Sequence, residues 1–465
     1  MEVDYLISGA GASGLSFLDV LIHESDATAA IVDRRDAPGG HWVDAYPFVR
    51  LHQPSDFYGV NSRPLGEERR STTGYNKGLP EVASKHEILH YFRDLMENVY
   101  LPTGRVTYFR NSEYMGDGRI KNLITGQITD ITITKKLVNA GYWGDQTSIP
   151  STHKRPFDVA DGITCVPPND LRNRAAGFDR FTVLGAGKTA MDSALWLMEQ
   201  GVAPDAITWV RPNDYWVFLR EQIIPHPDFF DQTVASIHAE TNSLATAETV
   251  DEHCRNMEAD GRWQRIDPDH WPTKFHAAVC SQAEIDNLRQ IKNVLRAGRV
   301  TRLSPGKIEM TGGSQAVADN PLYIDCTATG GVSIDPKAQV FEENEIKLLM
   351  VRPFQPLFSA ALIAHLEFGE YNDTIRKMSS QVTNFHETPA EYLPVQRQGF
   401  MNQYMWNQNP QIRAWIDASR LNAAFHLTKG LKRDDTDKID RLKALGSVTA
   451  KAVENIPKML ANSAS

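Results

Sequence analysis

The sequence contains few cysteines, only four in 465 residues. They are widely separated, at Cys165, Cys254, Cys280 and Cys326, and form neither a CxxC pair nor a metal-ligand spacing. Disulfide-stapled secreted proteins and dithiol reductases need closely patterned cysteines, so both classes are disfavoured and a reducing compartment is favoured. Isolated cysteines are more often small buried hydrophobic side chains than reactive thiols. We expect no metal site.

Long apolar runs and an excess of positive charge are missing as well. No run of about 18 apolar residues is available to cross a bilayer, and Glu2 and Asp4 leave no room for a signal peptide. Asp and Glu number 58 against 49 Lys and Arg, a net charge of −9, which argues against a nucleic-acid partner. We therefore expect a cytoplasmic protein with no membrane span and no nucleic-acid partner.

A glycine fingerprint is present close to the start of the chain. Residues 3–7 form an apolar run typical of a buried strand, residues 9–14 read GAGASG, and a second strand is expected at 29–32. In a dinucleotide-binding turn the first glycine permits the turn, the second admits a pyrophosphate and the third lets the helix pack on the strand. An acid is expected roughly 20 residues later to bind a ribose hydroxyl, and Asp33 fits that position. The candidate ligands of this first dinucleotide are Gly9, Gly11, Ser13, Gly14, Asp33 and Arg34.

A second fingerprint follows a strand expected at 181–184. Residues 185–190 read GAGKTA, and the next expected strand, 206–210, is followed by Arg211. An arginine here can pair with a ribose 2′-phosphate, which favours NADPH over NADH, although a solvated arginine at a strand end remains the alternative. Lys188 either adds charge to the turn or is a surface lysine. The candidate ligands of this second dinucleotide are Gly185, Gly187, Lys188, Thr189 and Arg211.

Further motifs lie between and after the two fingerprints. They are the Gly39-Gly40-His41-Trp42 run, the Tyr-Pro segment at 46–54, an expected helix at 85–92, and glycine turns at 139–143 and 328–330. With these motifs the chain resembles the FAD- and NADPH-dependent flavin monooxygenases, which comprise the flavin-containing and Baeyer-Villiger monooxygenases, over roughly residues 3 to 370. The resemblance implies FAD at the first fingerprint, with Gly40 and Trp42 among its contacts, and NADPH at the second. It also implies a flavin (hydro)peroxide that oxygenates a small organic substrate with molecular oxygen.

The chain departs from the family pattern in two segments. Six residues after the tyrosine of the Tyr-Pro segment the family carries an asparagine or an aspartate, and here the residue is His52. An imidazole with a near-neutral pKa beside the flavin suits proton transfer, and the alternative is a histidine that only donates or accepts a hydrogen bond. Asn61 is a candidate replacement for the missing amide, or else an ordinary turn residue. The segment 156–165 lacks a histidine that the family carries there, which indicates a divergent branch.

These motifs predict an α/β fold with two Rossmann-like dinucleotide-binding domains, in which the NADP domain splits the FAD domain and a helical C-terminal region follows. The expected boundaries are 1–148 and 319–375 for the FAD domain, 149–177 for a linker, 178–318 for the NADP domain with an insertion at about 213–278, and 376–465 for the helical region. Residues 323–327 are expected to lead into the last strand of the FAD sheet.

Two segments leave alternatives open. The insertion gathers aromatic and histidine residues, which indicates a packed lid core or a substrate box. An apolar stripe from Ile439 to Ile456 is typical of a helix that wraps the core or meets a second subunit, so a homodimer remains one of two expectations.

The sequence thus predicts an NADPH-dependent flavoprotein monooxygenase. Two rivals remain, an NAD(P)H-dependent flavin oxidase or reductase that never oxygenates a substrate, and a non-catalytic FAD-binding protein. Nothing in the sequence identifies the substrate.

Overall fold

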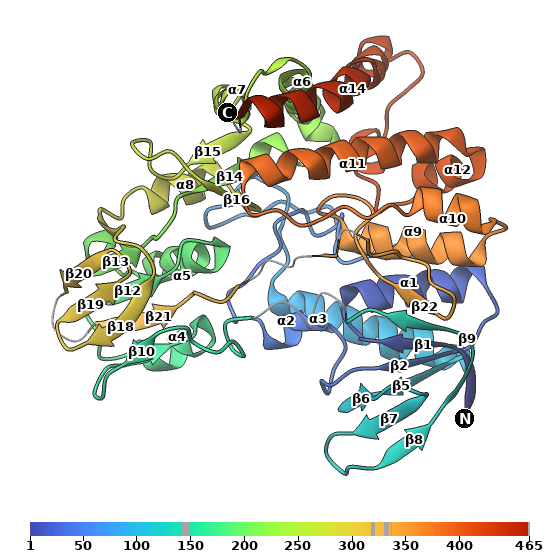
Figure 1. Ribbon diagram of the computed structural model, residues 1–465, viewed down its shortest axis with the longest axis horizontal. Coiled ribbons are helices and arrows are strands. Elements are labelled where there is room, and N and C mark those ends of the chain that lie inside the picture. Colours follow the sequence, from blue (N-terminus) through green and yellow to red (C-terminus); the bar gives the residue numbers. More distant parts are fainter. Residues whose placement is uncertain (142–148, 318–320, 330–333, 336, 464–465) are drawn as a thin grey trace.

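The fold is built around two parallel sheets, which lie on opposite sides of the molecule in the view of Figure 1. It is seen in a computed structural model that describes residues 1–141, 149–317, 321–329, 334–335 and 337–463. Positions 142, 143 and 330 of the two expected glycine turns lie outside the described residues.

The first sheet has five parallel strands. Their order is β22 (Glu345–Lys347), β9 (Thr132–Asn139), β1 (Glu2–Ser8), β2 (Ala29–Val32) and β5 (Val106–Phe109). All residues of β2 are buried, as expected of a central strand covered on both faces. Helix α1 (Ala12–Glu24) follows β1 and packs on α9 (Pro356–Phe368). The strands and helix predicted around the first fingerprint are confirmed.

The second sheet also has five parallel strands. Their order is β11 (Cys165–Val166), β21 (Leu322–Asp325), β12 (Phe181–Leu184), β13 (Ile207–Val210) and β17 (Asn293–Leu295). The prediction that residues 323–327 return to the first sheet is wrong, because β21 lies between β11 and β12. The return to the first sheet comes later, at β22. A buried run such as Leu-Tyr-Ile-Asp satisfies the interior of either parallel sheet, so its sequence does not say which sheet it joins.

The segment expected to be a plain linker also contributes to the second half of the molecule. It supplies β11 to the sheet, α4 (Pro168–Arg174), and β10 (Asp158–Val159), which pairs with β18 (Val300–Ser304). Strand β18 continues through β19 (Lys307–Met310) to β20 (Gly313–Ala316) in a small sheet. Residues 149–177 are therefore structured parts of this half.

The inserted segment forms a layer of its own. Its elements are the sheet β15 (Trp263–Arg265), β14 (Tyr215–Leu219) and β16 (Lys274–Cys280), with α6 (Phe230–Thr246) and α7 (Val250–Ala259). The C-terminal helix α14 (Thr436–Ser463) packs on α6 at the top of Figure 1. Trp216, Trp263 and Phe275 are fully buried here together with Ile456 of α14. Of the two interpretations of the aromatic cluster, the packed core describes these residues. Of the apolar stripe on α14, Ile456 is buried within its own chain.

The remaining elements complete the description. The helices are α2 (His41–Asp44), α3 (Lys85–Asp94), α5 (Lys188–Glu199), α8 (Gln282–Leu288), α10 (Asp373–Ser379), α11 (Pro389–Gln408), α12 (Pro410–Ala418) and α13 (Ala423–Leu427). The short strands are β3 (Gly59–Val60), β4 (Arg63–Pro64), β6 (Ser112–Tyr114), β7 (Arg119–Asn122) and β8 (Ile128–Asp130). Across the described ranges, no helix has both the length and the apolar composition needed to cross a membrane.

Candidate functional site

The two glycine turns have nearly the same backbone geometry. Gly9 and Gly185 follow β1 and β12 with φ of 115° and 116°, a conformation that side chains rarely adopt. Gly11 and Gly187 are the N-caps of α1 and α5, both with φ of −79° and ψ of −177°. No side chain caps either helix, so the first backbone N–H groups of both helices remain available to an anion.

The space around these glycines is confined at the first turn and open at the second. A Cβ on Gly14 would lie 2.0 Å from the carbonyl oxygen of Gly9, so the third position of the first turn requires glycine. A Cβ on Gly187 would meet no described atom within 4 Å, which leaves open space beside the second turn. A Cβ on Gly11 would lie 3.4 Å from the Cα of Gly40, so two residues without side chains face each other at the first turn. Both turns therefore present bare backbone at a helix N-terminus.

Asp33 holds the first turn in place. Its side chain is buried, and its two carboxylate oxygens accept hydrogen bonds from the backbone N–H of Ala10 at 2.8 Å and of Arg35 at 2.9 Å. The neighbouring Arg34 is exposed, and Arg35 pairs with Asp44 at 2.5 Å. Each carboxylate oxygen has a second lone pair, so these bonds leave acceptor capacity for a ribose hydroxyl.

The other residues predicted at the first turn lie in different surroundings. Ser13 is half-buried in the first turn of α1. Trp42 is buried, and its indole N–H donates to the hydroxyl of Tyr58 at 3.0 Å. Gly40 lies beside the turn, while Trp42 is directed into the hydrophobic core.

Arg211 is buried at the end of β13. It forms an ion pair with Asp214 and stacks over the ring of Trp209, with its guanidinium carbon 4.8 Å from the ring centroid. Asp214 also pairs with Arg296 at 3.1 Å, and Arg296 is a quarter exposed. Burial lowers the pKa of Arg211. The structure thus adds Arg296 to the cations at this strand end, a residue too distant in sequence to be found from the motif.

Lys188 forms two ion pairs at the start of α5. Its ammonium group lies 2.6 Å from Asp192 Oδ1 and 3.8 Å from Glu284 Oε1, and its side chain is only 15% exposed, so it is not the surface lysine of the alternative expectation. Burial opposes its protonation, but the two carboxylates raise the pKa of Lys188 overall. Thr189 is half-buried in the first turn of α5.

Lys188 belongs to a buried ion cluster that we define as Lys188, Asp192, Arg220 and Glu284. Arg220 donates to Glu284 Oε2 at 3.3 Å, and burial of Glu284 is outweighed by Lys188 and Arg220, which lower the pKa of Glu284 to about 2. The hydroxyl of Tyr46 donates to Asp192 Oδ2 at 2.7 Å. The spacing of Lys188 and Asp192 on one helix could have indicated their pairing, but nothing in the sequence points to the partners on η4 (Arg220–Gln222) and α8.

His52 lies against the buried ion cluster. Arg220 donates to the backbone carbonyl oxygen of His52. Burial, together with the charges of Lys188 and Arg220, lowers the pKa of His52 to about 3. The expectation of a near-neutral pKa is therefore wrong: two cations and the loss of water disfavour the imidazolium, and the ring is neutral at pH 7.

Asn61 lies in the turn between β3 and β4. Its side-chain oxygen accepts a hydrogen bond from the hydroxyl of Ser419 at 2.8 Å, which ties this turn to the segment after α12. The contact is with the C-terminal helical region.

Sequence comparison finds relatives of the chain among mycobacterial proteins. The chain is 40% identical over 422 residues to the uncharacterised proteins Rv2000 of Mycobacterium tuberculosis and Mb2023 of Mycobacterium bovis, a match that covers 91% of this chain and 78% of each relative. No family model matches the chain.

Solved structures are similar at low sequence identity. An oxidised steroid monooxygenase bound to NADP matches with a TM-score of 0.50 and 13% identity, covering 98% of this chain and 99% of that one. A flavin-containing monooxygenase from Stenotrophomonas maltophilia matches with a TM-score of 0.40 and 15% identity, covering 89% and 99%. The mixed α/β fold with its parallel sheets is thus similar to that of the steroid monooxygenase.

Proposed function

The chain belongs to the family of the uncharacterised mycobacterial proteins and has a flavin monooxygenase-like fold, and from this we propose that it is an NADPH-dependent flavoprotein monooxygenase acting on a small organic substrate. The observation that carries the proposal is the pair of uncapped helices, α1 and α5, which begin at glycines of identical φ and ψ at the ends of strands in two parallel sheets. Ligands bind at such strand ends in open α/β sheets.

In this proposal the FAD-binding domain is made from the first sheet, including β22. The NADP-binding domain is made from the second sheet, so that it runs from the segment containing β11 to β21 and interrupts the first domain. The boundary expected at residue 319 accordingly moves to the chain between β21 and β22.

FAD would be held by Gly9, Gly11, Gly14 and Asp33, and NADPH by Gly185, Gly187 and Thr189. Bound FAD supplies hydride acceptance and oxygen activation, which side chains cannot provide. The chain's own residues bind and orient the two dinucleotides through the helix N-termini, where backbone N–H groups and the helix dipole favour phosphate.

A preference for NADPH is supported by Arg211 and Arg296. Their guanidinium groups share Asp214, and Arg296 also pairs with Asp267 at 2.5 Å, so two cations and two carboxylates meet at this strand end. A ribose 2′-phosphate that enters here can take charge-assisted hydrogen bonds from the partly exposed Arg296.

His52 is proposed to act as a neutral group. With a pKa of about 3 it carries no proton to give from an imidazolium at pH 7, and its backbone is fixed by Arg220. Its part is to orient a neighbouring polar group through a ring nitrogen, as a donor or an acceptor set by its tautomer.

Anaerobic mixing of the flavin-loaded protein with NADPH tests the proposal. We expect the flavin absorbance to bleach with NADPH and to recover on admission of oxygen. Equally efficient bleaching by NADH would contradict the assignment of NADPH as the electron donor. If neither cofactor bleaches the flavin, the result would favour a non-catalytic FAD-binding protein.

Hydrogen peroxide release separates a monooxygenase from an oxidase or reductase. For each NADPH consumed, a monooxygenase supplied with its substrate releases little peroxide, whereas an oxidase releases close to one equivalent whatever organic compound is added. A panel of amines, sulfides and ketones is therefore screened for a fall in peroxide yield. No fall with any compound would favour the oxidase.

A further inference from the structure

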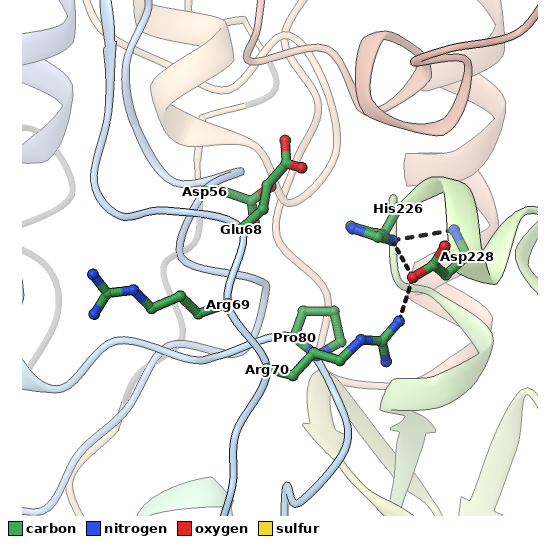
Figure 2. Close-up of a pocket in the computed structure, with 7 residues that line it drawn as sticks. All are labelled: Asp56, Glu68, Arg69, Arg70, Pro80, His226 and Asp228. Carbon is green, nitrogen blue, oxygen red and sulfur yellow. Dashed lines mark hydrogen bonds and ion pairs between the residues drawn. The ribbon is translucent and has the colours of Figure 1, made fainter.

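A polar cavity of about 250 Å³ lies apart from the two glycine turns. It is lined by Asp56, Glu68, Arg69, Arg70, Pro80, His226 and Asp228 (Figure 2). These residues come from the loop after His52 and from the start of the inserted layer. Because a single water molecule occupies only about 30 Å³ of liquid, the cavity has room for a small organic molecule.

Most charges around the cavity are already paired. Arg69 lies 2.8 Å from Glu67, Arg70 forms an ion pair with Asp228, and Lys429 forms one with Glu68. In Figure 2, Arg69 points away from the other labelled residues and Arg70 points toward Asp228. These ion pairs satisfy the surface charges and leave no excess positive charge to attract an anion.

Asp56 is different, because the residue is only 8% exposed and no described residue donates a hydrogen bond to its carboxylate oxygens. His426 Nδ1 lies 3.7 Å from Asp56 Oδ2. The Asp56 oxygens are not among the fully buried polar atoms that lack a partner, so they are open to the cavity and can accept a hydrogen bond from a molecule within it.

His426 cannot serve as that donor. Its Nε2 lies 2.6 Å from the carbonyl oxygen of Arg420, and a carbonyl only accepts, so Nε2 carries the proton of the neutral ring. Burial lowers the pKa of His426, which keeps the ring neutral and leaves a lone pair on Nδ1. Two acceptors, Asp56 Oδ2 and His426 Nδ1, therefore face each other without a proton between them.

Arg420 compensates the charge of Asp56 only at a distance. Its guanidinium donates to the backbone carbonyl oxygens of Asp56, Tyr58 and Val60, and not to the carboxylate. The carboxylate therefore keeps its acceptor capacity for a ligand.

We propose that this cavity binds the ammonium group of a small organic amine, which donates to the carboxylate of Asp56 and to Nδ1 of His426. Asp56 lines the cavity, and His426 lies behind the lining residues, 3.7 Å from Asp56 Oδ2. An ammonium ion has several N–H donors and a positive charge, and it therefore suits two facing acceptors of which one is a carboxylate. A metal ion is disfavoured, because the described residues contain no group of three or more potential ligands. The site does not depend on the flavin chemistry, and a protonated nitrogen held here has no lone pair to be oxidised.

Isothermal titration of the protein as purified with butylammonium chloride tests the proposal, with 1-butanol as the uncharged probe of similar shape. We expect saturable binding of butylammonium in the millimolar range or tighter and none of butanol. Asp56→Asn keeps the shape of the side chain and breaks no hydrogen bond to the carboxylate, and we expect it to weaken butylammonium binding about tenfold or more.

Asp117→Asn, which removes an acid that is 93% exposed on a distant turn, is the matched control and should bind butylammonium as the wild type does. Equal binding by wild type and Asp56→Asn, or no saturable binding by the wild type, would overturn the proposal. If Asp56→Asn does not fold, the readout is the butylammonium-dependent shift of the His426 ring resonances in the wild-type protein. Their failure to move would overturn it equally.

Discussion

At the scale of single residues, a substitution of Gly187 is expected to change NADPH binding without changing the stability of the fold. Its φ and ψ are open to any residue, and the space beside it is empty of described atoms. We expect Gly187→Val to leave the thermal midpoint unchanged and to raise the Kd for NADPH at least about tenfold, because the new side chain occupies the space proposed for a phosphate. Fluorescence titration and circular dichroism measure the two quantities. Unchanged NADPH affinity would contradict the proposal that this turn binds a phosphate of NADPH.

Arg211 tests the choice between the two nicotinamide cofactors. Its replacement by alanine removes one of two cations beside Asp214. We expect Arg211→Ala to raise the KM for NADPH about tenfold while the KM for NADH stays within about twofold, since only NADPH carries the 2′-phosphate. Steady-state kinetics with both cofactors measure this. An equal loss for both would show that the arginine acts only through the structure of the strand end.

Glu284 tests the energetics of the buried ion cluster. Its pKa in the fold, about 2, lies below the ordinary value of 4.5, so its ionised form stabilises the fold above pH 4.5 and this contribution is lost as the pH falls toward 2. The shift corresponds to about 3 kcal/mol. We expect Glu284→Gln to lower the free energy of unfolding at pH 7 by about this amount. The free energy of unfolding should also fall less in the variant as the pH is lowered from 4.5 toward 2. Denaturant titrations at several pH values measure it, with the exposed Glu343→Gln as the control that should change neither.

At the scale of elements, helix α14 offers two contrasting positions, the buried Ile456 and the solvent-facing Gly446. Ile456 is fully buried against the inserted layer, whereas a Cβ on Gly446 would meet no described atom within 4 Å. We expect Ile456→Ala to lower the free energy of unfolding by about 3 kcal/mol and Gly446→Ala to raise it by up to about 1 kcal/mol. Chemical denaturation measures both. A cost below about 1 kcal/mol for Ile456→Ala would mean that α14 is not docked in solution.

Helix pairing also explains how the C-terminal region is attached. Asn455 of α14 donates to the carbonyl oxygens of Leu244 at 3.1 Å and Ala247 at 2.8 Å, at the end of α6. These bonds satisfy carbonyls that a helix end leaves without partners. The last helix is therefore held by specific contacts as well as by its apolar stripe.

At the scale of the whole molecule, the two halves meet around the Tyr-Pro segment. Phe48 stacks on Trp196 of α5 with ring centroids 5.0 Å apart and an interplanar angle of 17°, and Tyr46 is bonded to Asp192 of the buried ion cluster. His52 follows on the same segment and is fixed by Arg220. The segment therefore couples the position of His52 in the first half to helix α5 in the second.

Cofactor binding is expected to stabilise the whole chain. FAD and NADP⁺ should each add their own increment, because each is proposed to bind at a separate glycine turn. FAD added to the apoprotein at about a hundredfold excess over its Kd should raise the free energy of unfolding by about 2.7 kcal/mol, and NADP⁺ should add a separate increment. Gly187→Val should lose the increment from NADP⁺ and keep the one from FAD. Thermal denaturation with each ligand measures this, and loss of both increments in the variant would show that the turns are not independent.

The sequence by itself determined the local elements. The strands at 29–32 and 181–184 and the helices that follow both glycine runs could be predicted, because the glycine spacing, the strand before it and the apolar periodicity after it are all read within about 30 residues. Arg211 at the end of the second unit follows from the same local pattern. The roles assigned to these residues in binding remain predictions.

Only the tertiary structure decided which distant residues meet. It placed β21 in the second sheet, turned Lys188 toward Asp192 and Glu284, and buried His52 beside two cations. Burial and these cations together lower the pKa of His52. It also left the carboxylate of Asp56 facing a cavity beside His426. Sheet membership, ion pairing and desolvation all depend on groups far apart in the chain, and a pattern of neighbouring residues carries no information about them.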